Sequence, residues 1–136
     1  MNKLYIDTDI VIDAVEDRKN IFGKNIGNPA ADLFIQAVSC KYQLILSTWM
    51  FHELCRHKII NDTRMFFELT KKKVITISHT EKDIVYAKSN NPSHFQDELH
   101  GMLALKSKAD CIVTRNISDF DNFKDKITIV KPEQLL

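Results

Sequence analysis

The sequence is poor in the residues that build disulfide frameworks, flexible joints and strongly charged surfaces. Its 136 residues include three cysteines, three glycines and three prolines, and the formal net charge is +1. The cysteines are odd in number and form no CxxC pair, which argues against a disulfide framework and against a zinc knuckle. With so few glycines and no low-complexity tract or repeat, little room remains for linkers. We therefore expect one domain over residues 1–136.

Long apolar runs are also missing. No segment approaches the length of a membrane span, and the chain starts in a strand pattern instead of a signal peptide. We expect a cytoplasmic protein with reduced cysteines and no membrane contact. The small net charge predicts no general attraction to nucleic acid. Between Phe51 and Lys73, however, six basic residues stand against three acidic ones. Such a cluster is typical of a solvated helix face or, less often, of an RNA-binding surface.

Short apolar runs alternate with longer helical patterns along the chain. Five runs lack polar alternation, which is typical of strands covered on both faces: 4–6, 44–46, 74–77, 111–113 and 127–130. Helical patterns occupy 10–16, 29–40, 49–58, 62–72, 80–89 and 95–108. Strands joined through helices predict a central, mainly parallel five-stranded sheet with helices on both faces, a three-layer α/β/α domain.

Three local signals predict where helices begin. Asn28 followed by Pro29 is a capping residue with proline at the first helical position. Thr80 with Asp83 three residues later predicts a capped helix start. Pro132 predicts the beginning of a short terminal helix.

Polar side chains follow the predicted strands at the points where the strands end. Asp7 comes directly after the first strand, and Glu53 would lie one turn into the helix after the second. Asp97 opens the helix before the fourth strand and is followed at once by Glu98; the pattern does not decide which of the two faces the site, and the family resemblance given below favours Asp97. Asn116 and Asp119 follow the fourth strand. Active sites of parallel sheets lie beyond the carboxyl ends of the strands, near a switch in strand order. We therefore expect five of these residues, with Asp97 in preference to Glu98, to meet at the edge of the sheet where the carboxyl ends of the strands lie, which we call the rim.

Carboxylate oxygens at such a rim suit Mg²⁺ or Mn²⁺, and no Cys/His ligand set competes with them. Ions of this kind activate water for phosphodiester cleavage. Asp9 is predicted either to bind the ion, to cap the first helix, or to order Asp7. Asp13 is predicted to be structural or exposed. The five histidines are predicted to be surface or structural residues, with only His100 able to approach the rim.

Three segments give the chain a resemblance to the PIN-domain family, in particular to VapC-like toxin ribonucleases of type II toxin–antitoxin pairs. They are YIDTDIVID (5–13), STWMFHEL (47–54) and DELHGMLALKSKADCIVTRNISDF (97–120), so the likeness covers almost the whole chain. The resemblance implies that Asp7, Glu53 and Asp97 bind Mg²⁺ or Mn²⁺. It places the family's Thr-x-Asp/Asn position on Thr114 and Asn116.

The resemblance also implies an activity and partners. Such proteins cleave RNA, often a transfer or ribosomal RNA, form homodimers, and are blocked by a cognate antitoxin protein. Asn116 stands where other members carry a fourth aspartate, which puts a second metal in doubt, and Asp119 is a candidate to supply the missing charge. Asp9 occupies a position often held by Asn, which favours a supporting role.

Other functions remain as alternatives. Asp7 to Val11 satisfies the short opening motif of haloacid-dehalogenase-like phosphatases, but a later lysine followed by paired acids is missing. Thr114 and Lys131-Pro132 match two positions of the response-regulator receiver pattern. The phosphoacceptor aspartate of that pattern is absent after the third predicted strand. A degenerate PIN module that binds RNA or protein without cutting is the third alternative, and Asn116 is the residue that favours it.

Overall fold

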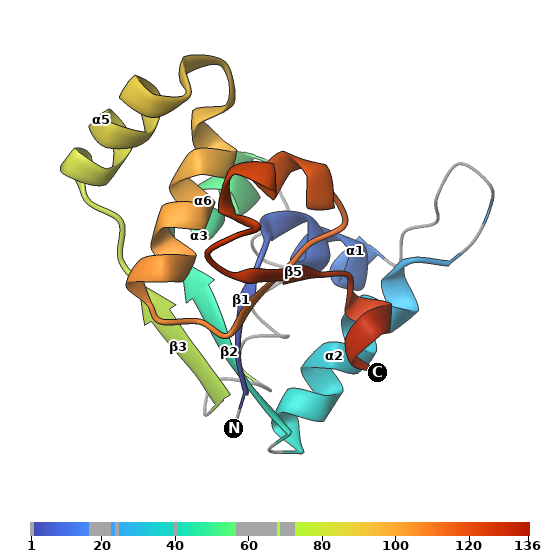
Figure 1. Cartoon of the computed structure of the whole chain (residues 1–136). Coiled ribbons are helices and arrows are strands. Elements are labelled where there is room, and N and C mark those ends of the chain that lie inside the picture. Colours follow the sequence, from blue (N-terminus) through green and yellow to red (C-terminus); the bar gives the residue numbers. More distant parts are fainter. Residues whose placement is uncertain (1, 17–22, 24, 40, 57–67, 69–72) are drawn as a thin grey trace.

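A parallel sheet runs through the centre of the computed structural model, which describes residues 2–16, 23, 25–39, 41–56, 68 and 73–136 (Figure 1). The strands found in these residues are β1 (Asn2–Ile6), β2 (Tyr42–Ser47), β3 (Val74–Ile77), β4 (Cys111–Val113) and β5 (Thr128–Val130). Their order is β3-β2-β1-β4-β5, and all neighbours pair in parallel. The predicted parallel sheet is confirmed.

The strand order places a switch point beside β1. The chain adds β2 and then β3 on one side of β1, and it adds β4 and then β5 on the other side. Leu4 of β1 lies opposite Leu44 on one side and Cys111 on the other. The connections diverge between β1 and β4, so the carboxyl ends of these two strands define the expected location of a binding site.

Helices connect the strands and cover the sheet. The α-helices are α1 (Thr8–Glu16), α2 (Gly27–Val38), α3 (Thr48–Arg56), α5 (Glu81–Asn90) and α6 (Phe95–Lys106). Short 3₁₀ helices lie at η2 (Pro92–His94), η3 (Ile117–Phe123) and η4 (Pro132–Leu135). Within the described segments, no helix combines the length and apolar character that a bilayer span requires.

Side chains of the central strands alternate between two hydrophobic cores. Leu4 and Ile6 of β1 point into a core shared with α1 and α2, while Tyr5 between them points into a second core with α6 and η3. All three side chains are at most 1% exposed. Because successive strand residues face opposite sides of a sheet, this alternation shows that β1 is covered on both faces. The three-layer α/β/α architecture is therefore confirmed.

Two local predictions need correction. The strands at 74–77 and 127–130 were expected to be covered on both faces, but β3 and β5 are the edge strands of the sheet, and Ile75, Thr76 and Thr128 are exposed. The cap of α2 is not Asn28: the helix begins at Gly27, and the side chain of Asn25 accepts hydrogen bonds from the backbone N–H groups of Gly27 and Asn28. Asn25 therefore supplies the capping oxygen three residues earlier than predicted.

Other predictions of helix starts hold. Thr80 and Asp83 form a complete capping box at α5, and Pro132 begins η4. Apart from Glu68, the predicted helix at 62–72 lies outside the described residues, and so does most of the basic region at 56–73.

Gly101 of α6 allows η3 to pack closely against that helix. A Cβ atom at this position would overlap the ring of Phe123, which is only 5% exposed. This contact matters for the rim because α6 carries Asp97 and η3 carries Asp119.

We expect Gly101→Ala to lower the free energy of unfolding by about 1–3 kcal/mol, because the added methyl group overpacks the core. In a Phe123→Leu background the same change should be much less harmful, since alanine by itself favours a helix over glycine by about 1 kcal/mol. Urea unfolding of the two single variants and the double variant measures this coupling. An equal loss in both backgrounds would contradict the assignment of the cost to Phe123.

Candidate active site

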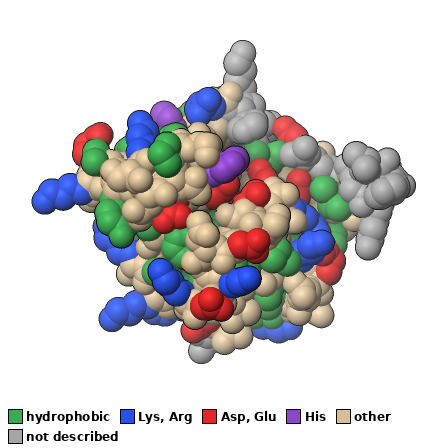
Figure 2. Space-filling model, turned by 45° about the horizontal axis from the view of Figure 1, so that its top comes forward, with side chains coloured by type: hydrophobic (Ala, Val, Ile, Leu, Met, Phe, Trp, Pro, Cys, Tyr) green, Lys and Arg blue, Asp and Glu red, His purple; other side chains and the backbone are tan. Residues whose placement is uncertain are grey.

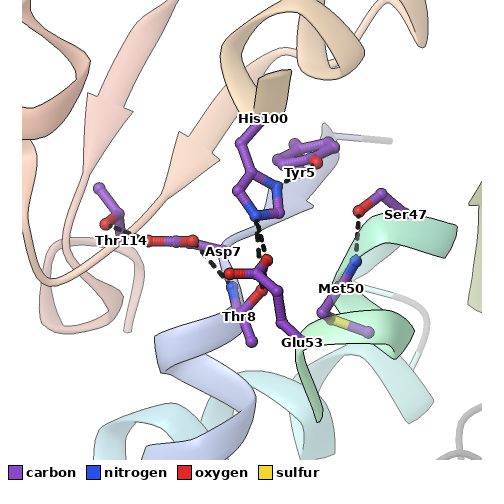
Figure 3. A network of polar contacts seen from close by, with 8 residues as sticks. All are labelled: Tyr5, Asp7, Thr8, Ser47, Met50, Glu53, His100 and Thr114. Atoms are coloured by element: carbon purple, nitrogen blue, oxygen red, sulfur yellow. Dashed lines mark hydrogen bonds and ion pairs between the residues drawn. The ribbon is translucent and has the colours of Figure 1, made fainter. Parts of the chain in front are cut away.

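Asp7 is the first residue after β1 and is only 9% exposed. Its backbone N–H continues the sheet ladder by donating to the Val113 carbonyl at 3.0 Å. The carboxylate accepts one hydrogen bond on each oxygen, from the Thr8 backbone N–H at 2.8 Å and from the Thr114 hydroxyl at 2.8 Å (Figure 3). Thr8, which follows β1, and Thr114, which follows β4, thus hold the Asp7 side chain from both sides.

Burial is the main reason why the pKa of Asp7 rises to about 6. The negative charges of Asp9 and Glu53 raise it further, while His100 and the Thr114 hydroxyl act in the opposite direction. Asp7 is therefore ionised at neutral pH, and its buried charge destabilises the folded state. A cation bound nearby would reduce this destabilisation.

Glu53 reaches the same place from α3, the helix that follows β2. The helix start is fixed by the Ser47 hydroxyl, which accepts a hydrogen bond from the Met50 backbone N–H at 3.0 Å. Oε1 of Glu53 accepts from the Thr8 hydroxyl at 2.8 Å (Figure 3). Thr8 therefore joins the two acids, with its backbone N–H on Asp7 and its hydroxyl on Glu53.

His100 is the residue of this site whose position the sequence analysis left open. It lies on α6, is 2% exposed, and brings Nε2 within 2.6 Å of Glu53 Oε1. Burial disfavours its charge, but the Glu53 hydrogen bond and the charges of Asp7, Glu53 and Asp97 outweigh burial and raise the His100 pKa. The available signal was its spacing, because a residue three positions after Asp97 lies on the same helix face.

Asp97 lies in the first turn of α6 and is partly buried. Burial is the largest cause of its raised pKa, followed by the charge of Asp119, with Glu53 adding a smaller contribution and His94 and His100 opposing it. The neighbouring Glu98 contacts Asn90 instead, through a hydrogen bond of 3.4 Å.

Asp97 and Asp119 also share a polar pocket of about 240 Å³. Its lining consists of Asn91, His94, Asp97, Ser118, Asp119, Asp121 and Asn122. Figure 2 shows the molecule turned so that the top of Figure 1 comes forward, and Asp and Glu side chains lie near the middle of this face around a histidine.

Asn116 is connected to the rim by a hydrogen bond to Asp9. Its side-chain amide donates to Asp9 Oδ2 at 2.8 Å, and its backbone N–H donates to the Thr114 hydroxyl oxygen at 3.0 Å. Thr114 in turn donates to Asp7. Asn116 therefore links Asp9 to Thr114, whose hydroxyl holds the Asp7 carboxylate.

Arg115, between Thr114 and Asn116, turns away from the rim. Its Nε lies 3.4 Å from Oδ2 of the buried Asp13, and it donates to the Ile26 carbonyl at 2.9 Å. It also pairs with Glu133. Asp13 therefore has a structural environment, as one of its two predicted alternatives required.

The donor chemistry of the rim fits a divalent cation, but its side chains do not form a closed ligand set as they stand. Asp7, Glu53 and Asp97 offer the oxygen ligands that Mg²⁺ and Mn²⁺ prefer. The charge of Glu53 contributes to the raised pKa of both other acids, so Glu53 lies within electrostatic reach of each of them. Among the described residues, however, no group of three or more His, Cys, Asp or Glu side chains could hold a metal ion directly.

Comparison with known proteins gives one informative result. No protein-family model matches the chain, and no curated protein matches it. Among solved structures it is similar to a chain of VapBC2 from Rickettsia felis, determined bound to a DNA fragment from their promoter. The TM-score is 0.57 at 15% sequence identity, over 95% of this chain and 97% of that chain. At this identity the likeness concerns the fold, and the chain has a three-layer α/β/α PIN-like fold.

Proposed function

We propose that the chain is a Mg²⁺- or Mn²⁺-dependent endoribonuclease, the toxin of a VapBC-type pair acting in the cytoplasm. One observation carries the proposal: Asp7 and Glu53 come from distant segments and meet through Thr8 at the switch point of a PIN-like sheet. Asp97 stands on the same rim, where the charges of Asp119 and Glu53 contribute to its raised pKa. One buried and two partly buried acids gathered in this way favour binding of a cation over a role in stability.

In the proposed mechanism Asp7, Glu53 and Asp97 hold the ion. When bound, the ion supplies an activated water and stabilises the charge that develops on the phosphodiester. Thr8 and Thr114 keep the Asp7 carboxylate in place for this task. Asp119 adds negative charge beside Asp97, and Asn116 orients Asp9.

The proposed substrate is RNA, with transfer and ribosomal RNA as the first candidates. The basic region at 56–73 would contact the phosphate backbone, although most of it lies outside the described residues. The proposed partners are a cognate antitoxin protein and a second copy of this chain. The similar Rickettsia felis chain comes from a VapBC2 complex, which supports the antitoxin proposal.

The proposal is tested by RNA cleavage with Asp97→Asn protein. A panel of transfer and ribosomal RNA is incubated with Mn²⁺, with EDTA, and with the variant. We expect discrete fragments that EDTA abolishes and that the variant forms at least about 100-fold more slowly, because a metal supplies several kcal/mol of transition-state stabilisation.

Asp125→Asn is the matched control, since it removes the charge of an exposed aspartate outside the rim. It should cleave like the wild type. Equal cleavage by Asp97→Asn would place the activity elsewhere or in a contaminant.

A module that binds RNA or a protein without cutting is the second candidate. Two observations favour it: Asn116 is neutral where a fourth acid is common in the resembling family, and the described side chains form no closed ligand set. Binding of Mn²⁺ without cleavage of any RNA in the panel would make it the better explanation.

A further inference from the structure

We infer that His100 is a positioning residue that fixes Glu53 for metal binding, and that Tyr5 in turn fixes the His100 ring. The inference rests on the proposed function, because it concerns the same carboxylate site. It assigns a specific role to His100 and Tyr5, which the sequence analysis did not place among the site residues.

Contacts on both ring nitrogens determine how His100 is oriented. Nε2 lies 2.6 Å from Glu53 Oε1, and Nδ1 lies 2.7 Å from the Tyr5 hydroxyl (Figure 3). The Tyr5 ring stands edge-on to the imidazole, with ring centroids 5.8 Å apart. His100 is 2% exposed and Tyr5 is 0% exposed, so water does not compete for these bonds.

The chemistry of the partners selects one tautomer of the neutral imidazole. An ionised Glu53 carboxylate can only accept hydrogen bonds, so the proton of the neutral ring lies on Nε2. Nδ1 is then an acceptor, and the Tyr5 hydroxyl donates to it. Tyr5 therefore favours the tautomer that can donate to Glu53.

Two donors converge on a single oxygen of Glu53. The Thr8 hydroxyl and His100 Nε2 both contact Oε1, from α1 and α6, while Glu53 itself stands on α3. A glutamate side chain has three rotatable bonds, and a free one would lose much of this freedom on binding an ion. Pre-orienting the carboxylate toward Asp7 removes part of that cost, as do the hydrogen bonds that support metal ligands in other proteins.

A purely structural role for His100 makes a different prediction. The neighbouring Leu99 and Leu103 on α6 are fully buried, so an apolar side chain suits this environment. Replacing only His100, however, leaves the Tyr5 hydroxyl and Glu53 Oε1 without this hydrogen-bond partner, which costs stability. If His100 only filled the core, His100→Leu would leave metal binding unchanged.

The test measures Mn²⁺ affinity without RNA by electron paramagnetic resonance, together with thermal stability and the kcat and KM of RNA cleavage. We expect His100→Leu to remain folded with a lower melting temperature, to bind Mn²⁺ about 10- to 100-fold more weakly and to lose kcat to a similar extent. The KM for RNA should stay unchanged. His100→Gln should keep most of the affinity, because its amide can still donate to Glu53.

Tyr5→Phe completes the test, since it removes only the hydroxyl that holds Nδ1. It should weaken Mn²⁺ binding in the wild-type background and have no further effect in the His100→Leu background. Tyr42→Phe is the matched control: its buried hydroxyl donates to the Leu135 carbonyl at 2.7 Å, and the residue belongs to the other core. This variant should lose stability at most and keep its Mn²⁺ affinity.

The outcomes separate this inference from the proposed function. Wild type that binds Mn²⁺ in the expected variant pattern, but cleaves no RNA, would overturn the nuclease proposal and support the positioning role. Normal Mn²⁺ affinity in His100→Leu, or equal losses in the Leu and Gln variants, would overturn the positioning role alone. Wild type that binds no Mn²⁺ would overturn both.

Discussion

Replacing Asp7 with asparagine is expected to abolish RNA cleavage and, at the same time, to make the protein more stable at pH 8. Asparagine keeps the shape of the side chain but removes the charge that holds the ion. We expect cleavage to fall by about 1,000-fold or more, which corresponds to about 4 kcal/mol of lost transition-state stabilisation.

The gain in stability follows from the raised pKa of Asp7. The folded state shifts this pKa from its ordinary value of 3.8 to about 6. Ionised Asp7 therefore costs the folded state about 3 kcal/mol at pH 8. Asparagine removes this cost, but its amide N–H₂ group replaces one oxygen that accepts from Thr8 or Thr114. Subtracting that lost hydrogen bond leaves an expected net gain of about 1–2 kcal/mol by urea unfolding.

The pH dependence gives the sign of the effect an independent check. Because its folded pKa is raised, Asp7 destabilises the protein above pH 6, and this cost is lost as the pH falls from 6 toward 3.8. The stability advantage of Asp7→Asn should therefore be largest at pH 8 and shrink below pH 6.

Asp83→Asn is a control of opposite sign. Burial opposes the charge of Asp83, but hydrogen bonds from Thr80 and Lys106 outweigh burial and lower its pKa. Its carboxylate stabilises the fold above its ordinary pKa, and this contribution is lost as the pH falls through the lowered value. Asp83→Asn should thus destabilise at pH 8 and approach the wild type in acid. The same pH trend in both variants would contradict the assignment for Asp7.

The parts of the site that follow directly from strand ends were predictable. A strand buried on both faces is a continuous apolar run, and β1 shows one in Leu4, Tyr5 and Ile6. The polar residue that ends such a run must lie at the carboxyl end of the strand, which is where Asp7 is found. Asp97 did not follow from the helix start in the same way, because Asp97 and Glu98 both lie in the first turn of α6 and only the resemblance to the PIN-domain family singled out Asp97.

The sequence contains less information about how elements are ordered across the sheet. Periodicity does not distinguish a central strand from an edge strand, and the run at 74–77 therefore gave no warning that Ile75 is exposed. The Asn25 cap was not predicted because Asn28-Pro29 is a stronger local signal for a helix start. Asn25 nevertheless accepts the hydrogen bonds from the first backbone N–H groups of the helix.

The contacts of His100 depend on three elements at once. Tyr5 belongs to β1, Glu53 to α3 and His100 to α6, so their meeting requires the strand order as well as the helix faces. A histidine in a mostly apolar helix is usually a satisfied core residue, and only the tertiary structure shows that the group satisfying it is the carboxylate of Glu53.

Mn²⁺ should raise the melting temperature of the protein at pH 8, and EDTA should reverse the change. An ion that binds only the folded state stabilises it by about 2.7 kcal/mol at 100 times its dissociation constant. For a domain of this length, that corresponds to about 8–10 °C. The shift should be smaller at pH 5.5, because protons compete with the ion for Asp7, whose pKa is about 6.

Variants locate the ion that causes this shift. Asp125→Asn should keep the full increase in melting temperature, while Asp7→Asn should lose it although the variant starts from a more stable protein. A full shift in Asp7→Asn that disappears in Asp119→Asn would place the ion in the polar pocket beside Asp97. The site would then lie at the junction of α6 and η3 instead of the switch between β1 and β4. In that case the contacts of Asp7 with Thr8 and Thr114 would serve the fold, and the nuclease proposal would lose the observation that carries it.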